Sequence, residues 1–182
     1  QISAAVNGKN IMFSPTSLNF ALGTIAAGAK GETKEVLCNY LGTDDFASYA
    51  KEYLNKIKEY NTEDESYGYK SKLKIADAVW VDNNLTLQEE FKNSVTNGFE
   101  AEVENVDFSA AEKTCGIINS WCDKNTEGLI PKIITPDQIN DTTGLCLTNS
   151  LYFESGWSGE PWNVSDTEEK FGNNEKTKYM TC

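Results

Sequence analysis

Serine and cysteine side chains are the candidate nucleophiles of this sequence, which contains no histidine to act as their general base. Triads that depend on histidine, and zinc sites that contain it, are therefore excluded. Five cysteines are widely spaced and form no C-x-x-C pattern: Cys38, Cys115, Cys122, Cys146 and Cys182. This spacing favours small buried thiols over disulfides or metal ligands. A hydrolase is a weak hypothesis, and we expect neither an enzyme nor a cofactor or metal.

One polar side chain interrupts an apolar row in the stretch "LCLTNSLYFE", residues 145–154. Its apolar residues alternate, as they do on one face of an extended strand: Leu145, Leu147, Leu151 and Phe153. Asn149 falls on the same face. Burying a carboxamide without partners costs about 1–3 kcal/mol. We therefore predict that this face is buried and that other polar residues satisfy Asn149; the alternative is an exposed strand face.

Composition and charge limit the class of protein and its partners. The chain has 182 residues, of which 39% are hydrophobic and 24% charged, typical of a soluble globular protein. Its net charge of −12 argues against a nucleic-acid partner and against an anionic membrane surface. No linker divides the chain, so residues 1–182 are expected to form a single domain. It begins without methionine or a signal-peptide core, which suggests an excised segment.

The first third of the chain predicts three helices. Ser14 and Pro15 form a strong helix start, with serine as the N-cap and proline at the first helical position. Residues 18, 21, 22 and 25 are apolar at helical spacing and predict one buried stripe, with small residues beside it that permit close packing. A short helix over 33–41 ends at Gly42. Residues 46–57 show the pattern of another amphipathic helix.

The rest of the chain mixes strands with helices. "KLKIADAVWVD" (72–82) is apolar on both faces, as in a strand between two layers, and "AEVENVDF" (101–108) is a second strand. A helix is expected near 87–97. Ser109 and Glu112 match a capping box that opens another helix, closed by Gly128 and Pro131. With the strand at 145–154, the pattern predicts an α+β fold in which helices cover a large mixed or antiparallel sheet.

Four stretches, in this order and spacing, resemble the serpins, the serine protease inhibitor family. They are "NIMFSPTSLNFALGTIAAGAKGET" (10–33), "LKIADAVWVDNNLTLQEEF" (73–91), "INSWCDKNTEGLIPKII" (118–134) and "LTNSLYFESGW" (147–157). Any one of them alone would be a weak signal, but the combination is specific. The resemblance covers nearly the whole chain. It implies the N-terminal half of a serpin fold, with the first three strands of the central sheet present and the reactive-centre loop lacking.

The resemblance also assigns roles to particular residues. In serpins the serines at the helix start and the asparagine of the strand meet behind the sheet, in a region called the shutter. These positions are Ser14, Ser17 and Asn149 here, and a histidine that usually joins them is absent from this chain. Trp157 resembles the tryptophan of the breach, where the reactive loop first enters the sheet. The helix carrying Trp121 resembles the one that lies across the sheet and must yield during insertion.

The function implied is inhibition of serine-type, or alternatively cysteine-type, endopeptidases by conformational trapping. The protease cleaves an exposed loop, which then inserts into the sheet; no reactive bond lies in this chain. The expected partners are the target protease and a C-terminal serpin segment, and the expected location is extracellular. Two alternatives stay open. One is a non-inhibitory serpin-like structural or interaction protein, and the other is a carbohydrate-binding module built on Tyr152, Trp157 and Trp162.

Overall fold

The central feature of the computed structural model is a three-stranded mixed sheet of order β2-β1-β3. The structure describes residues 13–61, 71–156, 163–171 and 175–181. Strand β1 (Ser71–Asp82) pairs in parallel with β2 (Glu102–Val106) and antiparallel with β3 (Leu145–Ser155). The ladder between β1 and β3 runs without a break from Ser71–Ser155 to Val81–Leu145. The predicted α+β class and the three sheet strands are confirmed.

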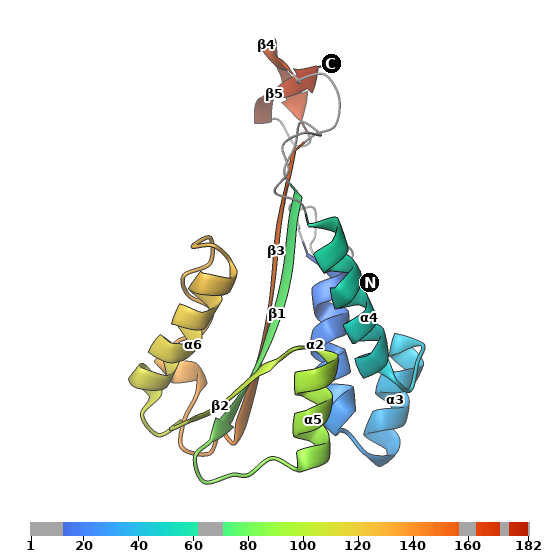
Figure 1. Cartoon of the computed structure of the whole chain (residues 1–182). Helices are drawn as coiled ribbons and strands as arrows, with labels where there is room; N and C mark the ends of the chain where they lie inside the picture. The colour runs from blue at the N-terminus through green and yellow to red at the C-terminus, as the bar shows by residue number, and fades with distance from the viewer. Residues whose placement is uncertain (1–12, 62–70, 157–162, 172–174, 182) are drawn as a thin grey trace.

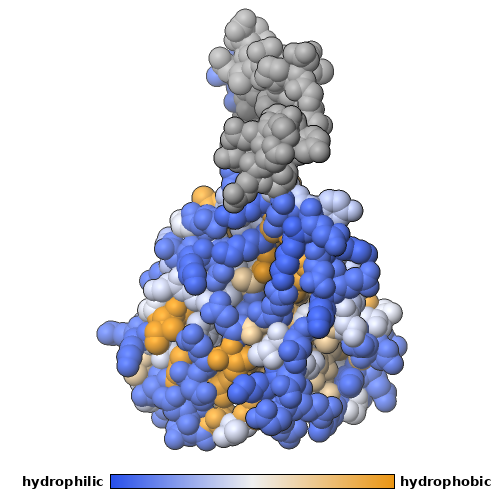
Figure 2. Space-filling model, viewed as in Figure 1, coloured by the Kyte–Doolittle hydropathy of each residue, from blue (hydrophilic) through white to orange (hydrophobic). Residues whose placement is uncertain are grey.

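Helices cover both faces of this sheet (Figure 1). On one face lie α2 (Pro15–Gly28), α3 (Gly31–Leu41), α4 (Phe46–Tyr60) and α5 (Glu89–Gly98), and on the other lies α6 (Ala111–Asn125). Figure 2 shows hydrophobic side chains between the two helical layers, within a mostly hydrophilic surface. No helix within the described ranges is both long and apolar enough to cross a bilayer.

Three further elements follow α6. A short 3₁₀ helix, η2, spans Pro136–Gln138 and precedes β3. Strands β4 (Asn163–Phe171) and β5 (Glu175–Thr181) form a separate antiparallel pair. These two strands were not predicted from the sequence, because "NVSDTEEKF" and "EKTKYMT" contain few apolar residues and therefore lack the alternation that marks a half-buried strand.

The core between the sheet and the four-helix layer is built around aromatic rings. Phe20 on α2 lies edge-on to both Phe46 and Phe99, with ring centroids 6.0 and 6.1 Å apart. All three rings are nearly inaccessible to solvent. Gly23 on α2 makes this packing possible, because a Cβ atom there would lie 2.1 Å from the Phe46 ring. The predicted close approach of α2 to its neighbours therefore depends on this glycine.

The buried face of α2 differs from the predicted stripe. Leu18 and Ile25 are 40% and 43% exposed, whereas Phe20, Gly23 and Ala26 are buried. The contact between Gly23 and Phe46 turns the small-residue face of the helix toward α4, because only that face allows so close an approach. The face that carries Leu18 and Ile25 is correspondingly left outside the core.

The core under α6 joins two tryptophans and two thiols. Trp80 on β1 and Trp121 on α6 meet edge-to-face with centroids 6.1 Å apart. Cys115 and Cys122 are buried beside them, as predicted, and burial is the main cause that raises the pKa of each thiol. Neither thiol has the lowered pKa of a reactive cysteine. Core filling therefore accounts for both residues.

The predicted capping box at the start of α6 is wrong. Ser109 donates its hydroxyl and its backbone N–H to Oδ1 of Asp107, at 2.6 and 3.0 Å. The pattern also lies one residue too early, because a capping box at Ser109 requires that residue to be the N-cap of the helix. The helix begins at Ala111, and its N-cap, Ala110, makes no side-chain bond. A capping box is found instead at Thr135 and Gln138 of η2.

We expect Gly23→Ala to destabilise the fold by about 1–3 kcal/mol, since the new methyl group would overlap a ring that its neighbours hold in place. Gly116→Ala is the matched control, because Gly116 lies in α6 and a Cβ atom there would meet no other group within 4 Å. That change should stabilise the chain by up to about 1 kcal/mol. Urea unfolding measures the change in the free energy of unfolding for each variant. Equal changes in Gly23→Ala and Gly116→Ala would contradict the packing argument.

Candidate functional site

The free edge of β3 lines a groove that extends over both faces of the strand. No strand among the described residues pairs with β3 on the side away from β1. The groove has a volume of about 580 Å³. On the α2 side it is lined by Phe13, Ser17 and Asn149, and on the α6 side by residues that include Thr126 and Ile130. An unpaired edge with side chains on both sides is a place where a further strand can be added.

Ser14 and Ser17 lie at the start of α2, and both line this groove. Ser14 is the N-cap, as predicted, and its Oγ accepts the backbone N–H of Ser17 at 3.2 Å. The hydroxyl of Ser17 donates to Oδ1 of Asn149 on β3. The structure therefore brings Ser17 and Asn149 into direct contact, whereas Ser14 reaches them only through the helix start. Their shutter role stays a prediction.

Asn149 is also bound from the neighbouring strand. Its Nδ2 donates to Oδ1 of Asp77 at 2.9 Å, and the two residues are directly opposite in the ladder between β1 and β3. The carboxamide thus uses its donor toward β1 and its acceptor toward α2. Polar partners satisfy both ends of Asn149, as predicted. The prediction of a buried face holds only in part, because Asn149 is half-buried and Leu145 and Phe153 are exposed.

Asp77 is the member of this cluster that sequence reasoning missed. Its side chain is 4% exposed, and Oδ2 has no hydrogen-bond partner among the described residues. Burial raises the pKa of Asp77 to about 6, although the bond from Asn149 acts in the opposite direction. A signal was present, because aspartate is almost never fully buried unless paired, and "IADAVWV" places one among apolar residues.

The aromatic residues singled out by sequence have separate positions. Trp157 and Trp162 lie outside the described residues, so the predicted breach residue is not placed. Tyr152 on β3 donates its hydroxyl to Glu154 at 2.6 Å, and Lys72 lies over its ring. The indole of Trp121 packs in the core under α6, and its Nε1 has no partner among the described residues. Tyr152 thus lies among charged side chains, whereas Trp121 lies in an apolar core.

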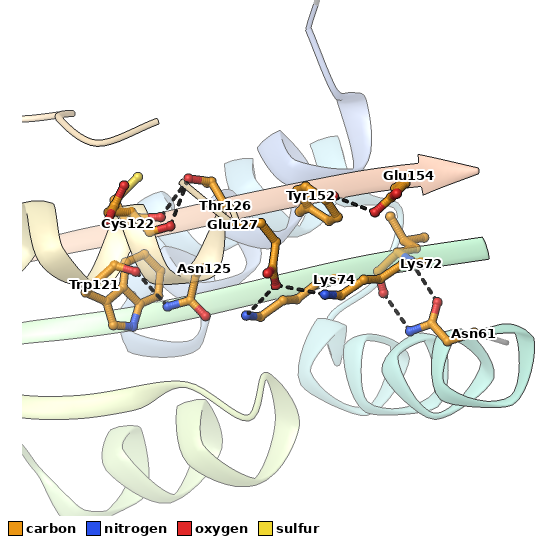
Figure 3. A network of polar contacts seen from close by, with 12 residues as sticks. Asn61, Lys72, Lys74, Trp121, Cys122, Asn125, Thr126, Glu127, Tyr152 and Glu154 are labelled. Atoms are coloured by element: carbon orange, nitrogen blue, oxygen red, sulfur yellow. Dashed lines mark hydrogen bonds and ion pairs between the residues drawn. The ribbon is translucent and has the colours of Figure 1, made fainter. Parts of the chain in front are cut away.

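The start of β1 is held at its edge and from the α6 face (Figure 3). At the edge away from β3, Asn61, which follows α4, accepts the N–H of Leu73 at 2.7 Å and donates to its C=O at 2.9 Å. On the α6 face Glu127 follows the helix with a φ of 52° and accepts a bond from Lys72 at 2.8 Å. The Nζ of Lys74 lies 3.8 Å from the same carboxylate oxygen. A solvent-exposed ion pair thus connects the residue after α6 to the sheet.

Ser17→Ala should lower the free energy of unfolding by about 1–2 kcal/mol, because it leaves Oδ1 of Asn149 without its donor. Ser14→Ala should cost about 1 kcal/mol through loss of the N-cap. A double-mutant cycle with Asn149→Leu separates the two effects. Ser17→Ala should cost little in that background, whereas Ser14→Ala should cost as much as before. Additivity of Ser17→Ala and Asn149→Leu would show that the bond contributes nothing.

Asp77→Asn should stabilise the chain at neutral pH and leave its stability at about pH 4 nearly unchanged. The pKa of Asp77 is higher in the folded than in the unfolded chain, so the folded state gains stability relative to the variant as pH falls through 6 toward 3.8. The difference at neutral pH should be on the order of 3 kcal/mol at most. Urea unfolding at several pH values measures this difference. If the free energy of unfolding changes with pH in the same way for both proteins, the raised pKa of Asp77 is refuted.

A family described as serpin, serine protease inhibitor, matches residues 1–181 of the chain. Among curated relatives, Serpin-ZXA of Oryza sativa subsp. japonica is 35% identical over 163 residues, covering 89% of this chain and 41% of its own length. Neuroserpin of Homo sapiens is 31% identical over 165 residues, covering 88% of this chain and 38% of its own length. The chain thus spans about two-fifths of these relatives.

Solved structures show the same likeness. The native stressed conformation of Arabidopsis AtSerpin1 aligns over 100% of this chain and 47% of its own, with a TM-score of 0.78 and 28% identity. The structure of Manduca sexta serpin-12 aligns over 97% of this chain and 49% of its own with a TM-score of 0.81. At 22% identity, this second likeness concerns the fold alone. On the family match and the identities to these relatives, the chain belongs to the serpin family of serine protease inhibitors.

Proposed function

We propose that the protein carrying this chain inhibits endopeptidases, of the serine type first and of the cysteine type as a second class, by trapping them during cleavage. Family membership supports inhibition in general. The observation that carries the proposal is the groove along β3, because it combines an unpaired strand edge with side chains on both faces. An added strand would pair with the backbone of β3 and cover these side chains.

The chemistry of cleavage belongs to the protease in this proposal. The protease hydroxyl or thiol attacks a carbonyl carbon of an exposed loop, the new amino end leaves, and an ester or thioester joins the loop to the protease. The loop comes from a segment outside this chain and enters the sheet beside β3. The added strand supplies hydrogen bonds and apolar burial, which provide the free energy that distorts the attached protease.

The polar cluster of Ser17, Asn149 and Asp77 is suited to the insertion of a strand. We further propose that the sheet shifts relative to the helices behind it when a strand is added to β3. Hydrogen bonds between Ser17, Asn149 and Asp77 can break singly and be replaced, whereas interdigitated apolar side chains would have to separate together. On the other face, the contact between the residue after α6 and the sheet is a single exposed ion pair, which can also break singly.

The test incubates the protein with a panel of serine and cysteine proteases and looks for a covalent complex that survives denaturing electrophoresis. Leu151→Asp places a charge in the groove and should convert the inhibitor into a substrate, with several times more cleaved product per complex formed. Val36→Asp on α3 is the control, because Val36 is an exposed apolar residue that does not line the groove.

Two other results would change the conclusion. Cleavage of the unmodified protein by every protease without a covalent complex would favour the non-inhibitory serpin-like alternative. If Leu151→Asp and the unmodified protein give the same ratio of cleaved product to covalent complex, the inserted strand does not use this groove. The serine or cysteine preference follows directly from which proteases form the complex.

A further inference from the structure

The orientation of the Asn149 carboxamide is determined by its two neighbours. A carboxamide has a donor end and an acceptor end, and it can exchange them by turning about its last bond. An ionised carboxylate accepts hydrogen bonds only, so it selects the NH₂ end of its partner. Asp77 on β1 takes that end at 2.9 Å, which leaves the oxygen of Asn149 for the hydroxyl of Ser17.

Among the described residues of this chain, few other groups near Asp77 could influence its charge; the histidine that the resemblance adds to the cluster is not in this chain. Helix α2 carries no titratable side chain between Pro15 and Gly28, and the same face of β3 carries none between Leu145 and Phe153. Helix α4 contributes the half-buried phenol of Tyr53 to this core, and its lysines and glutamates are exposed. On β2, Val103 packs toward this core. Oδ2 of Asp77 is buried without a partner among the described residues.

We propose that Asp77 is a positioning residue for Asn149, whose ionised carboxylate holds the carboxamide in one orientation and whose protonation allows the carboxamide to turn round. In the protonated form Asp77 can donate to Oδ1 of Asn149, and Nδ2 of Asn149 can then donate to the oxygen of Ser17. Both arrangements contain two hydrogen bonds, so the neutral acid permits either, whereas the carboxylate permits one.

This inference has a consequence for strand uptake that rests on the proposed function. With Asp77 ionised, the link from β3 to α2 has one geometry, and a shift of the sheet over α2 has to break it. With Asp77 protonated, the carboxamide can change partners as the sheet shifts. We therefore expect inhibition to become faster as the pH falls through about 6, the pKa that burial gives Asp77.

The first test follows the side-chain amide resonances of Asn149 in the ¹⁵N-labelled protein between about pH 8 and about pH 4.5. Loss of the signal in Asn149→Leu identifies it. We expect the resonances to shift with a midpoint near pH 6 in the unmodified protein and to stay constant in Asp77→Asn. Glu52→Gln, which alters an exposed ion pair on α4, should leave the titration intact. Resonances that do not titrate, or that titrate equally in Asp77→Asn, overturn the proposal.

The second test measures the rate of complex formation with a protease identified by the panel. The rate of the unmodified protein is divided by that of Asp77→Asn, because this ratio cancels the pH dependence of the protease. The ratio should rise by about three- to tenfold between about pH 7.5 and about pH 5, the range that one hydrogen bond gives. A constant ratio, together with titrating resonances, would overturn the link to strand uptake alone. If no protease forms a complex, the proposed function fails, and the resonances still decide the role of Asp77.

Discussion

The hydrogen bonds of a single carboxamide are the interaction on which the rest of this arrangement depends. Asn149 stands half-buried in the apolar row of β3, and both ends of its side chain are hydrogen-bonded. Asp77 satisfies one end across the ladder, and Ser17 satisfies the other from the first turn of α2. Two strands and one helix therefore have to meet at one point, which fixes the position of α2 against the sheet.

Packing far from that point makes the meeting possible. Gly23 leaves room for the ring of Phe46, so α2 packs closely against α4, and the hydroxyl of Ser17 at the start of the same helix reaches β3. The opposite face of the sheet is supported differently, by the contact of Trp80 with Trp121 and by the ion pair at the end of α6. Apolar packing therefore supports both faces of the sheet, and the polar cluster lies on the α2 face.

The sequence predicted part of this cluster. Asn149 was recognisable because the apolar residues of β3 alternate, so that one polar residue in the row is conspicuous. Asp77 was missed because β1 is buried on both faces and has no alternation to interrupt. The capping box at Ser109 failed for another reason, since the helix begins at Ala111, one residue later than the pattern requires. Local patterns predict which residues are unusual, whereas the partner of each depends on tertiary contacts that local patterns do not contain.

The unbroken ladder between β1 and β3 also sets a length. Strand β3 has 11 residues, and an extended chain advances by about 3.3 Å per residue, so its free edge is about 36 Å long. A segment that covers the whole edge has to be extended over the same distance and cannot contain a helical turn, which would shorten that part of it by more than half. Side chains of such a segment would point alternately toward α2 and toward α6. Every second residue of the segment would therefore face α2, where the amide of Asn149 and the hydroxyl of Ser17 lie. The residues between them would face α6, where these two groups are absent.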